Sequence, residues 1–151
     1  MDFFTNPQFQ VVLQLILAVV LGALIGLERE YNKKEAGMRT YSLVCLGSTL
    51  FTILGFMGFQ MVKGTAGVSF DPSRVVQAVA VGIGFLGAGL IIFEKFHTRG
   101  LTSAAGLWLT AAVGVALGIQ LYFIAIISSV LAIIVLAGFG AIENKLVGPK
   151  E

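Results

Sequence analysis

Residues 77–108 read QAVAVGIGFLGAGLIIFEKFHTRGLTSAAGLW, and this stretch decides the fold. An apolar segment with four glycines is followed by a short charged loop and a second segment rich in small residues. Residues 82–87 formally match the dinucleotide-binding fingerprint, but that motif works only between a strand and a soluble helix. Here it lies inside a run of about 18 apolar residues, which is long enough to cross a bilayer. The pattern therefore predicts a closely packed membrane helix with small contact positions at Gly82, Gly84, Gly87 and Gly89.

The composition places most of the chain in lipid. Of its 151 residues, 57% are hydrophobic and only 12% are charged, and the mean hydropathy is +0.94. A soluble domain cannot bury so much apolar surface. The single cysteine, Cys45, excludes an internal disulfide and a cysteine-based zinc site, and we expect it to pack inside the protein. No basic stretch is long enough to bind nucleic acid.

Five apolar segments predict five transmembrane helices in a single domain. The segment from Leu101 to Gly140 is apolar for 40 residues. As one helix it would be about 60 Å long, twice the hydrocarbon thickness of a bilayer. It must therefore fold back, and the predicted turn is at 118–120. The fold class is an all-α membrane protein, a bundle of five transmembrane helices packed through small-residue faces, with spans at about 9–27, 41–62, 74–93, 101–118 and 121–140.

The positive charges predict the orientation of the bundle. Eight of the ten Lys and Arg residues lie in the loops at 28–40 and 94–100 and in the C-terminal tail, and five spans put these segments on one face. Positive charge marks the cytoplasmic side. We therefore place the N-terminus outside and the C-terminus in the cytoplasm. The N-terminus lacks a basic n-region and a cleavage site, so we expect the first span to stay in the mature protein.

Small residues predict how the helices pack, because lipid offers no hydrophobic drive for association. Span one carries Gly22 and Gly26, and span three carries Gly84 between Ala80 and Ala88. We expect spans one, three and four to form the tight centre and the fifth to face lipid. In a second interpretation one such face joins two protomers of a homo-oligomer, and the sequence does not distinguish the two. Span four has an unbroken small row at Thr102, Gly106, Thr110, Gly114 and Gly118.

Two pairs of charged residues lie near predicted membrane edges. Glu28 and Arg39 flank the first basic loop; they form an ion pair that closes the bundle or anchors a partner, or else they are solvated interface charges. Asp71 and Arg74 stand three apart on the opposite side. Because Asp-Pro opens a helix, Asp71 is predicted to be an N-cap, and a cation or partner contact is the alternative.

Three further side chains are candidates for recognition. Gln77 lies one turn inside span three and is expected to point into the bundle, for bonding between helices or for ligand recognition. Thr102 is expected to bond its own backbone. Trp108 lies about 10 Å below the interface, so its indole N–H should find a partner within the bundle, through packing or in a functional pocket. The tyrosines, Tyr31, Tyr41 and Tyr122, are interpreted as interface anchors.

The same residues argue against catalysis and against active transport. No acidic residue lies at mid-span, whereas pumps and secondary transporters carry ionisable groups or broken helices there. A Mg²⁺ ion keeps several waters and needs only one or two carboxylates, so the edge acids leave a Mg²⁺ contact open. His97 has no second metal ligand nearby, and no nucleophile arrangement is present. We expect no enzyme activity and no cofactor, and the sequence assigns no metal site.

Several short stretches, in order and spacing, resemble the MgtC/SapB family of bacterial inner-membrane proteins. The match covers about 90 residues and most of the predicted membrane core. The resemblance implies a five-helix membrane domain with its N-terminus outside. The stretches are Gly26-Leu27-Glu28-Arg29-Glu30, Gly37-Met38-Arg39-Thr40, Leu43-Val44-Cys45-Leu46-Gly47, residues 82–89, Gly100-Leu101-Thr102-Ser103-Ala104-Ala105, Trp108 and Ala111-Ala112-Val113-Gly114.

The resemblance also implies a function. Family members are linked to survival in low magnesium and, in pathogens, to growth inside macrophages, and they regulate other membrane machines, notably the proton-driven ATP synthase. Carried over by motif, the candidate positions are Glu28, Arg39, Gln77, Thr102 and Trp108. Better-known members have a soluble C-terminal domain, and we expect this chain to provide the membrane core alone.

We therefore expect an inner-membrane regulator that binds another membrane complex. The alternatives are a Mg²⁺ or other cation channel or transporter, with Asp71 or Glu28 near its entrances, and a structural scaffold without a ligand.

Overall fold

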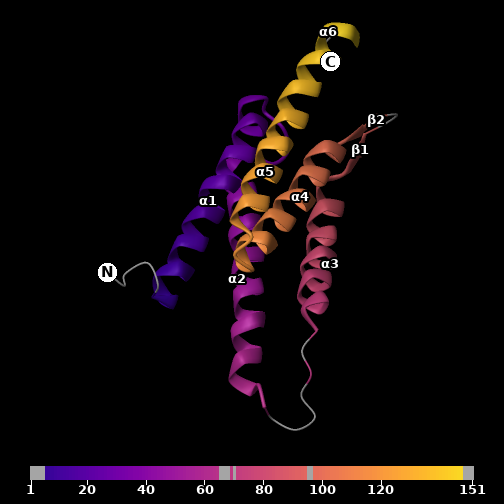
Figure 1. The fold of residues 1–151 in the computed structure, drawn as a ribbon. Coiled ribbons are helices and arrows are strands. Elements are labelled where there is room, and N and C mark those ends of the chain that lie inside the picture. Colours follow the sequence, from indigo (N-terminus) through magenta and orange to yellow (C-terminus); the bar gives the residue numbers. More distant parts are fainter. Residues whose placement is uncertain (1–5, 65–68, 70, 95–96, 148–151) are drawn as a thin grey trace.

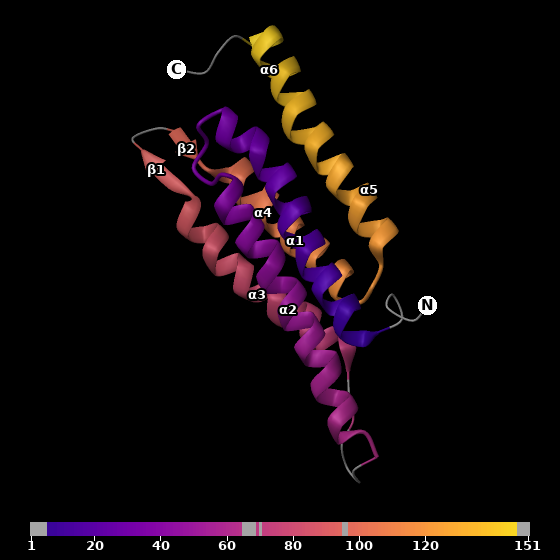
Figure 2. The same ribbon diagram turned by 90° about the vertical axis from the view of Figure 1, so that its left-hand side faces the viewer.

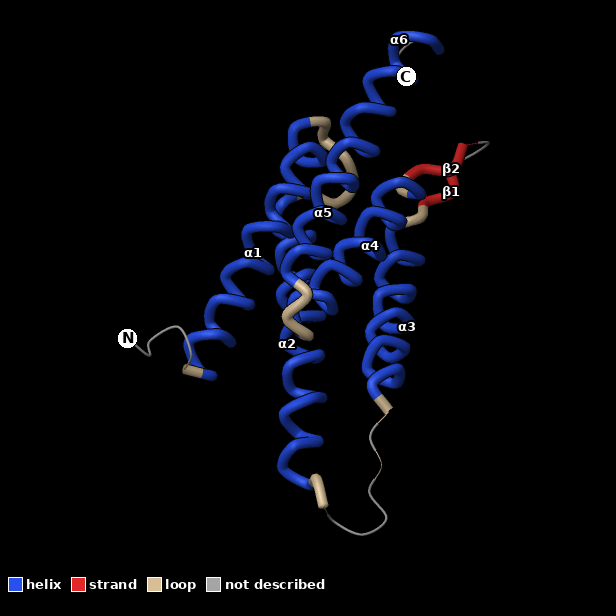
Figure 3. Tube along the Cα trace, viewed as in Figure 1, coloured by secondary structure: helices blue, strands red, loops and turns tan. Residues whose placement is uncertain are grey.

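A computed structural model describes residues 6–64, 69, 71–94 and 97–147. Among these residues, five helical segments are long and apolar enough to cross a membrane, which confirms the predicted fold class. Figure 3 shows that helix dominates and that strand is confined to one short hairpin. The elements are α1 (Pro7–Tyr31), α2 (Met38–Val62), α3 (Pro72–Leu90), β1 (Ile92–Glu94), β2 (His97–Arg99), α4 (Leu101–Gly118), α5 (Tyr122–Ile133), the π-helical η1 (Ile134–Phe139) and α6 (Gly140–Val147).

Local sequence signals explain where the helices begin. At the start of α1, the Asn6 side chain accepts a hydrogen bond from the Gln8 N–H, with Pro7 in the first turn. The Asp71 carboxylate accepts from the Ser73 N–H at 2.9 Å and so caps α3. This confirms the capping role predicted from the Asp-Pro pair, since a side-chain oxygen satisfies one of the free amides at a helix start.

The predicted fold-back between the last two spans is also present. Helix α4 ends at Gly118, and Gln120 adopts a left-handed backbone with φ +63°. The Leu121 N–H donates to the Ala116 carbonyl at 2.8 Å, which closes the turn before α5. The rod that follows continues through η1 into α6, so the helix extends beyond the predicted limit at residue 140.

The centre of the bundle differs from the prediction. Helix α2 contacts α1 and α4 extensively, whereas α3 packs mainly on one side of α4 and buries only Ile83 (Figure 2). The tight centre is therefore α1, α2 and α4 rather than spans one, three and four, and α3 is more exposed than α5. The small buried residues of α2 include three hydroxyl-bearing side chains, which form no row as long as that of span four: Ser48, Thr49 and Thr52.

The two ends of the bundle differ in charge. We call the end with the α1–α2 loop, the β1–β2 hairpin and α6 the hairpin end, and it lies at the top of Figure 1. Lys63 and Arg74 lie toward the opposite end. Lys95 and Lys150, which entered the orientation prediction, lie outside the described residues. The other basic residues of that prediction lie at the hairpin end: Arg29, Lys33, Lys34, Arg39, Arg99 and Lys145.

Helix α3 ends at Leu90, before the predicted span limit at residue 93, and a hairpin follows. Ile92 and Phe93 belong to β1, which pairs antiparallel with β2. Gly100 then joins β2 to α4 with φ +84°, and a Cβ at this position would collide with the Leu90 carbonyl. Only glycine fits this close approach of the chain to the end of α3.

Candidate functional site

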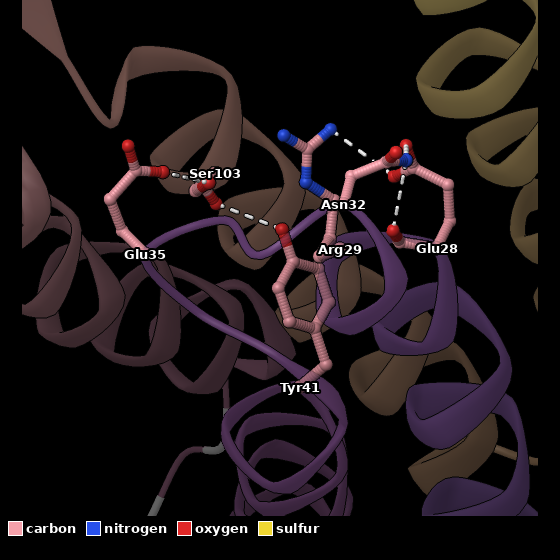
Figure 4. Close-up of polar contacts among 6 residues, drawn as sticks. All are labelled: Glu28, Arg29, Asn32, Glu35, Tyr41 and Ser103. Atoms are coloured by element: carbon pink, nitrogen blue, oxygen red, sulfur yellow. Dashed lines mark hydrogen bonds and ion pairs between the residues drawn. The ribbon is translucent and has the colours of Figure 1, made fainter.

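Six polar residues from three helices and the α1–α2 loop meet at the hairpin end, and we call them the polar cluster: Glu28, Arg29, Asn32, Glu35, Tyr41 and Ser103 (Figure 4). Arg29, in the last turn of α1, is only 4% exposed. Its Nη1 lies 3.2 Å from Glu28 Oε2. The Asn32 amide donates to Glu28 Oε1 at 2.6 Å and to the Glu28 carbonyl at 3.1 Å. These contacts fix the end of α1 where the chain turns toward α2.

The other half of the polar cluster joins the α1–α2 loop to α4. The Ser103 hydroxyl donates to Glu35 Oε2 at 2.8 Å, and the Tyr41 hydroxyl donates to the Ser103 carbonyl at 3.1 Å. Tyr41 is fully buried. Gly106, one turn further along α4, makes room for it, because a Cβ there would collide with the Tyr41 hydroxyl. The cluster therefore holds one loop and two helix starts together.

The charges of the polar cluster are unevenly satisfied. Burial of a charge is costly unless hydrogen bonds compensate for lost water, yet Arg29 Nε and Glu28 Oε2 have no hydrogen-bond partner among the described residues. Glu35 is better supported. The backbone N–H of Glu35 holds the pKa of that carboxyl below its ordinary value, helped by the Ser103 hydroxyl and by the charges of Lys34 and Arg99.

The opposite end of the bundle is closed by a glutamine. Gln14 of α1 is 2% exposed, and its Nε2 donates to the Leu117 carbonyl at 2.6 Å and to the Gly118 carbonyl at 3.1 Å. The last carbonyls of a helix have no partner within it. The Leu117 carbonyl also accepts from the Gln120 N–H at 3.0 Å. Gln14 therefore adds a second donor to the Leu117 carbonyl and supplies a donor to the Gly118 carbonyl at the end of α4.

Hydroxyl groups in the interior bond to backbone carbonyls. Thr49 Oγ1 lies 2.8 Å from the Cys45 carbonyl of its own helix and 2.9 Å from the Gly114 carbonyl of α4. Ser48, Thr52, Thr110 and Ser129 each bond a carbonyl one turn earlier. Such bonding satisfies hydroxyls inside a membrane helix. Among the described residues, no three His, Cys, Asp or Glu side chains gather as a metal-binding group.

A groove of about 810 Å³ runs between α2 and α3, with Ala111 of α4 also lining it. Its lining is mostly apolar, and Arg74 is the charged residue among the lining positions. Thr40 and Ser48 are its hydroxyl-bearing residues.

Among the charged candidates, the possible Glu28–Arg39 ion pair does not form among the described residues, whereas Asp71 is placed as predicted. Glu28 pairs with Arg29 rather than with Arg39, which is exposed in the first turn of α2. Arg29 is favoured because it lies beside Glu28 at the same helix end, where Arg29 is buried and Glu28 is partly buried. Asp71 is occupied as the cap of α3, and Arg74 is exposed beside the groove.

The three other candidates lie on the outside of this chain. Gln77 is exposed and does not point into the bundle, because the buried side of α3 is the one that carries Ile83. Thr102 is exposed in the first turn of α4. Trp108 is 56% exposed rather than enclosed in the bundle. Tyr41 also differs from its prediction, since it is buried and is no interface anchor, whereas Tyr31 is exposed.

The predicted packing glycines fall into two groups. At Gly22, Gly26, Gly106 and Gly114 a Cβ would collide with α2 or with the chain just before it, so these glycines permit close helix contact. Gly87 makes ordinary contact with Ala104 at 3.6 Å. At Gly82, Gly84 and Gly89 a Cβ would meet nothing within 4 Å.

Sequence reasoning passed over Gln14, Arg29, Glu35 and Ser103 as site residues. Two of them carried a usable signal. Gln14 is an amide inside an apolar run, and the argument applied to Gln77 applies equally to it. Arg29 follows Gly22 and Gly26 at helical spacing, which puts it on the packed face of α1. The Glu35–Ser103 contact joins positions 68 residues apart and had no such signal.

Comparison with known sequences identifies relatives along most of the chain. The sequence model of the MgtC family matches residues 15–145. The putative magnesium transporter YhiD of Escherichia coli strain K12 is 40% identical over 135 residues, which are 89% of this chain and 63% of YhiD. SrpB of Synechococcus elongatus is 38% identical over 87% of this chain and 75% of SrpB. MgtC of Brucella abortus strain 2308 is 42% identical over 78% of this chain and 46% of that protein.

The chain thus spans less than two thirds of the length of YhiD and about half that of the Brucella protein. None of these three names describes an enzyme. No solved structure matches the chain.

Proposed function

This chain belongs to the MgtC family of membrane proteins, and we propose that it is a bacterial inner-membrane regulator that binds another membrane complex during adaptation to low magnesium. A proton-driven ATP synthase is one complex of this kind. The proposed orientation has the N-terminus outside and the hairpin end in the cytoplasm, because positive charge gathers at that end.

The outward position of Gln77 carries this proposal. Gln77 lies five residues into α3, a helix long enough to span the membrane, on the side away from the bundle. An amide in contact with acyl chains has no hydrogen-bond partner, which is costly in lipid. Gly84 and Ala88 follow at seven and eleven residues, so they share its face and allow a helix to approach closely. A partner helix that offers a donor or acceptor satisfies this surface.

The packing of the centre also supports binding over conduction. Helices α1, α2 and α4 meet through glycines with no room for a methyl group, and the interior hydroxyls bond to carbonyls. A densely packed interior resists opening of a path. The exposed outer face of α3 is then one surface that is open to recognition.

Crosslinking in the membrane tests the proposal. A photoreactive amino acid replaces Gln77 in one variant and Val12, an exposed residue of α1, in a matched control. We expect the Gln77 variant to form a protein adduct, identified by mass spectrometry as a subunit of a membrane complex, and the Val12 variant to react with lipid. Purification of that complex with the native chain, and its loss on Gln77→Leu, completes the test. Lipid adducts alone at both positions contradict the proposal.

A cation transporter is the second candidate, favoured by the name of the Escherichia coli relative. Its test is Mg²⁺ flux into proteoliposomes that contain the purified full chain, with Glu28→Ala and Asp71→Ala as variants. Saturable flux that either variant abolishes supports transport. Flux equal to that of empty liposomes, from protein shown to be folded, removes this candidate.

A further inference from the structure

We propose that the groove between α2 and α3 is a phospholipid site, in which an acyl chain lies along the groove and Arg74 binds the lipid phosphate. This inference uses a different side of α3 from the face of Gln77 and does not depend on the proposed function. It concerns a ligand of the membrane itself rather than a protein partner.

The dimensions of the groove suit one acyl chain. Its volume is about 810 Å³, and along α3 its lining runs from Arg74 to Leu86. These residues are twelve positions apart, about 18 Å at 1.5 Å per residue. Half of a hydrocarbon layer about 30 Å thick is about 15 Å. A chain whose headgroup lies at Arg74 therefore extends along the groove as far as a lipid leaflet is deep.

The position of Arg74 fits the headgroup level. It lies in the first turn of α3, three residues after the capping Asp71. The neighbouring part of α2 is at Gly55, where a Cβ would approach Val75 Cγ2 at 2.8 Å. Helix α4 ends about one turn away along α2, where Gly118 faces Thr52. The start of α3 and the end of α4 thus lie within about one turn of each other along α2, which itself continues to Val62, and the proposed lipid phosphate lies at this level.

The chemistry of the groove end at Arg74 supports the binding of a phosphate there. A guanidinium binds phosphate through paired, charge-assisted hydrogen bonds. Arg74 is exposed, and among the described residues its guanidinium makes no direct ion pair. The nearby Asp71 is engaged by the Ser73 N–H at 2.9 Å and the Ser73 hydroxyl at 2.7 Å. Arg74 therefore keeps its donors for an anionic ligand.

The groove has space along both walls that no side chain of the described residues fills. Gly47 of α2 and Gly82 of α3 both line it, and a Cβ at either position would meet nothing within 4 Å. Packing between α2 and α3 thus does not require glycine at these two positions. Inside the groove, the Ser48 hydroxyl bonds the Val44 carbonyl at 2.8 Å. The lining therefore suits an apolar chain that neither donates nor accepts hydrogen bonds.

Native mass spectrometry of the purified full chain in detergent, titrated with phosphatidylglycerol, tests the site. Gly82→Leu fills the groove, and Arg74→Gln removes the phosphate ligand. Gly84→Leu is the matched control, because Gly84 is equally uncrowded but lies on the outer face of α3. Diacylglycerol with the same acyl chains lacks the phosphate, and glycerol phosphate lacks the acyl chains. Circular dichroism and elution volume establish that each variant is folded.

We expect the native chain and Gly84→Leu to retain one phosphatidylglycerol. Arg74→Gln should weaken binding roughly tenfold or more, the loss expected for hydrogen bonds to a charged group. Diacylglycerol should bind the native chain as weakly, and Gly82→Leu should lose the bound lipid. If Gly82→Leu does not fold, Gly47→Leu on the facing wall takes its place.

Three results would overturn the site. Equal lipid binding by the native chain, Gly82→Leu and Arg74→Gln excludes the groove as the binding site. Equal binding of diacylglycerol and phosphatidylglycerol excludes phosphate recognition by Arg74. A dimer that forms without lipid and disappears in Gly82→Leu assigns the groove to a second copy of the chain instead.

Discussion

At the scale of single residues, polar side chains in this protein act mainly by satisfying buried backbone groups. Gln14 is the clearest case, because one amide reaches the carbonyls of both Leu117 and Gly118 at the end of α4. At the hairpin end, the Tyr41 hydroxyl likewise donates a hydrogen bond to the Ser103 carbonyl. In an apolar surrounding, a carbonyl without a donor costs far more than it does in water.

Replacement of Gln14 tests this role. Gln14→Leu keeps a side chain of similar size but removes the donor of the Gly118 carbonyl and the second donor of the Leu117 carbonyl, so we expect a loss of about 1–3 kcal/mol of stability. Reversible unfolding of the detergent-solubilised chain measures it. Gln60→Leu, at an exposed position of α2, is the control and should leave the unfolding midpoint unchanged. Equal stability of the native chain and Gln14→Leu would contradict the capping role.

Glu35 makes a pH-dependent contribution. Its pKa is lowered from the ordinary 4.5, chiefly by its own backbone N–H and also by the Ser103 hydroxyl. A lowered pKa in the folded state stabilises the fold above the unfolded pKa, and this contribution is lost as pH falls through the folded value. The stability difference between the native chain and Glu35→Gln should therefore be fully present at about pH 6–7 and shrink progressively as the pH falls below the ordinary pKa of 4.5. A difference that does not vary with pH would show that the Glu35 charge is not involved.

At the scale of secondary-structure elements, α2 is the helix on which the bundle is assembled. Glycines of α1 and α4 face it from two sides, and its Ser and Thr side chains bond carbonyls without adding bulk. Helix α3, which has more glycines free of contact, packs at the edge. A glycine in a membrane helix therefore marks close packing only where atoms of another helix reach it.

This distinction predicts opposite effects for two similar substitutions. Gly114→Ala would push a methyl group into Ser48 and the Cys45 carbonyl, and we expect it to destabilise the bundle by about 1–3 kcal/mol. Gly89→Ala meets nothing within 4 Å and should leave stability unchanged or slightly raised, since alanine favours helix over glycine. Unfolding of both variants in the same detergent measures the difference. Equal losses would show that the α2–α4 contact is not specifically tight.

At the scale of the whole molecule, the distribution of charge and the order of the helices give a testable topology. Lys34 lies in the loop at the hairpin end, and Lys63 lies at the far end of α2. In a Cys45→Ala background, we expect an impermeant maleimide added to spheroplasts to label Lys63→Cys and to spare Lys34→Cys until the membrane is opened. The reverse pattern would invert the proposed orientation.

Much of the fold was predictable from the sequence, and much of the site was not. The turn at 118–120 followed from length alone, because 40 apolar residues exceed one crossing of a bilayer. The Asp71 cap followed from local chemistry. The inward direction predicted for Gln77 and the indole partner predicted for Trp108 were wrong for this chain, since both side chains are exposed. Those predictions required knowing which neighbours each helix face meets.

The sequence by itself determined that the chain forms five apolar helices and where they turn. These properties depend on the hydrocarbon thickness and on the need of each helix to satisfy its own backbone, and both are read along the chain. Only the tertiary structure decided that α2 lies at the centre and that Glu35 meets Ser103. Helices in lipid select one another by the fit of surfaces from distant segments, and apolar composition is nearly the same on every face.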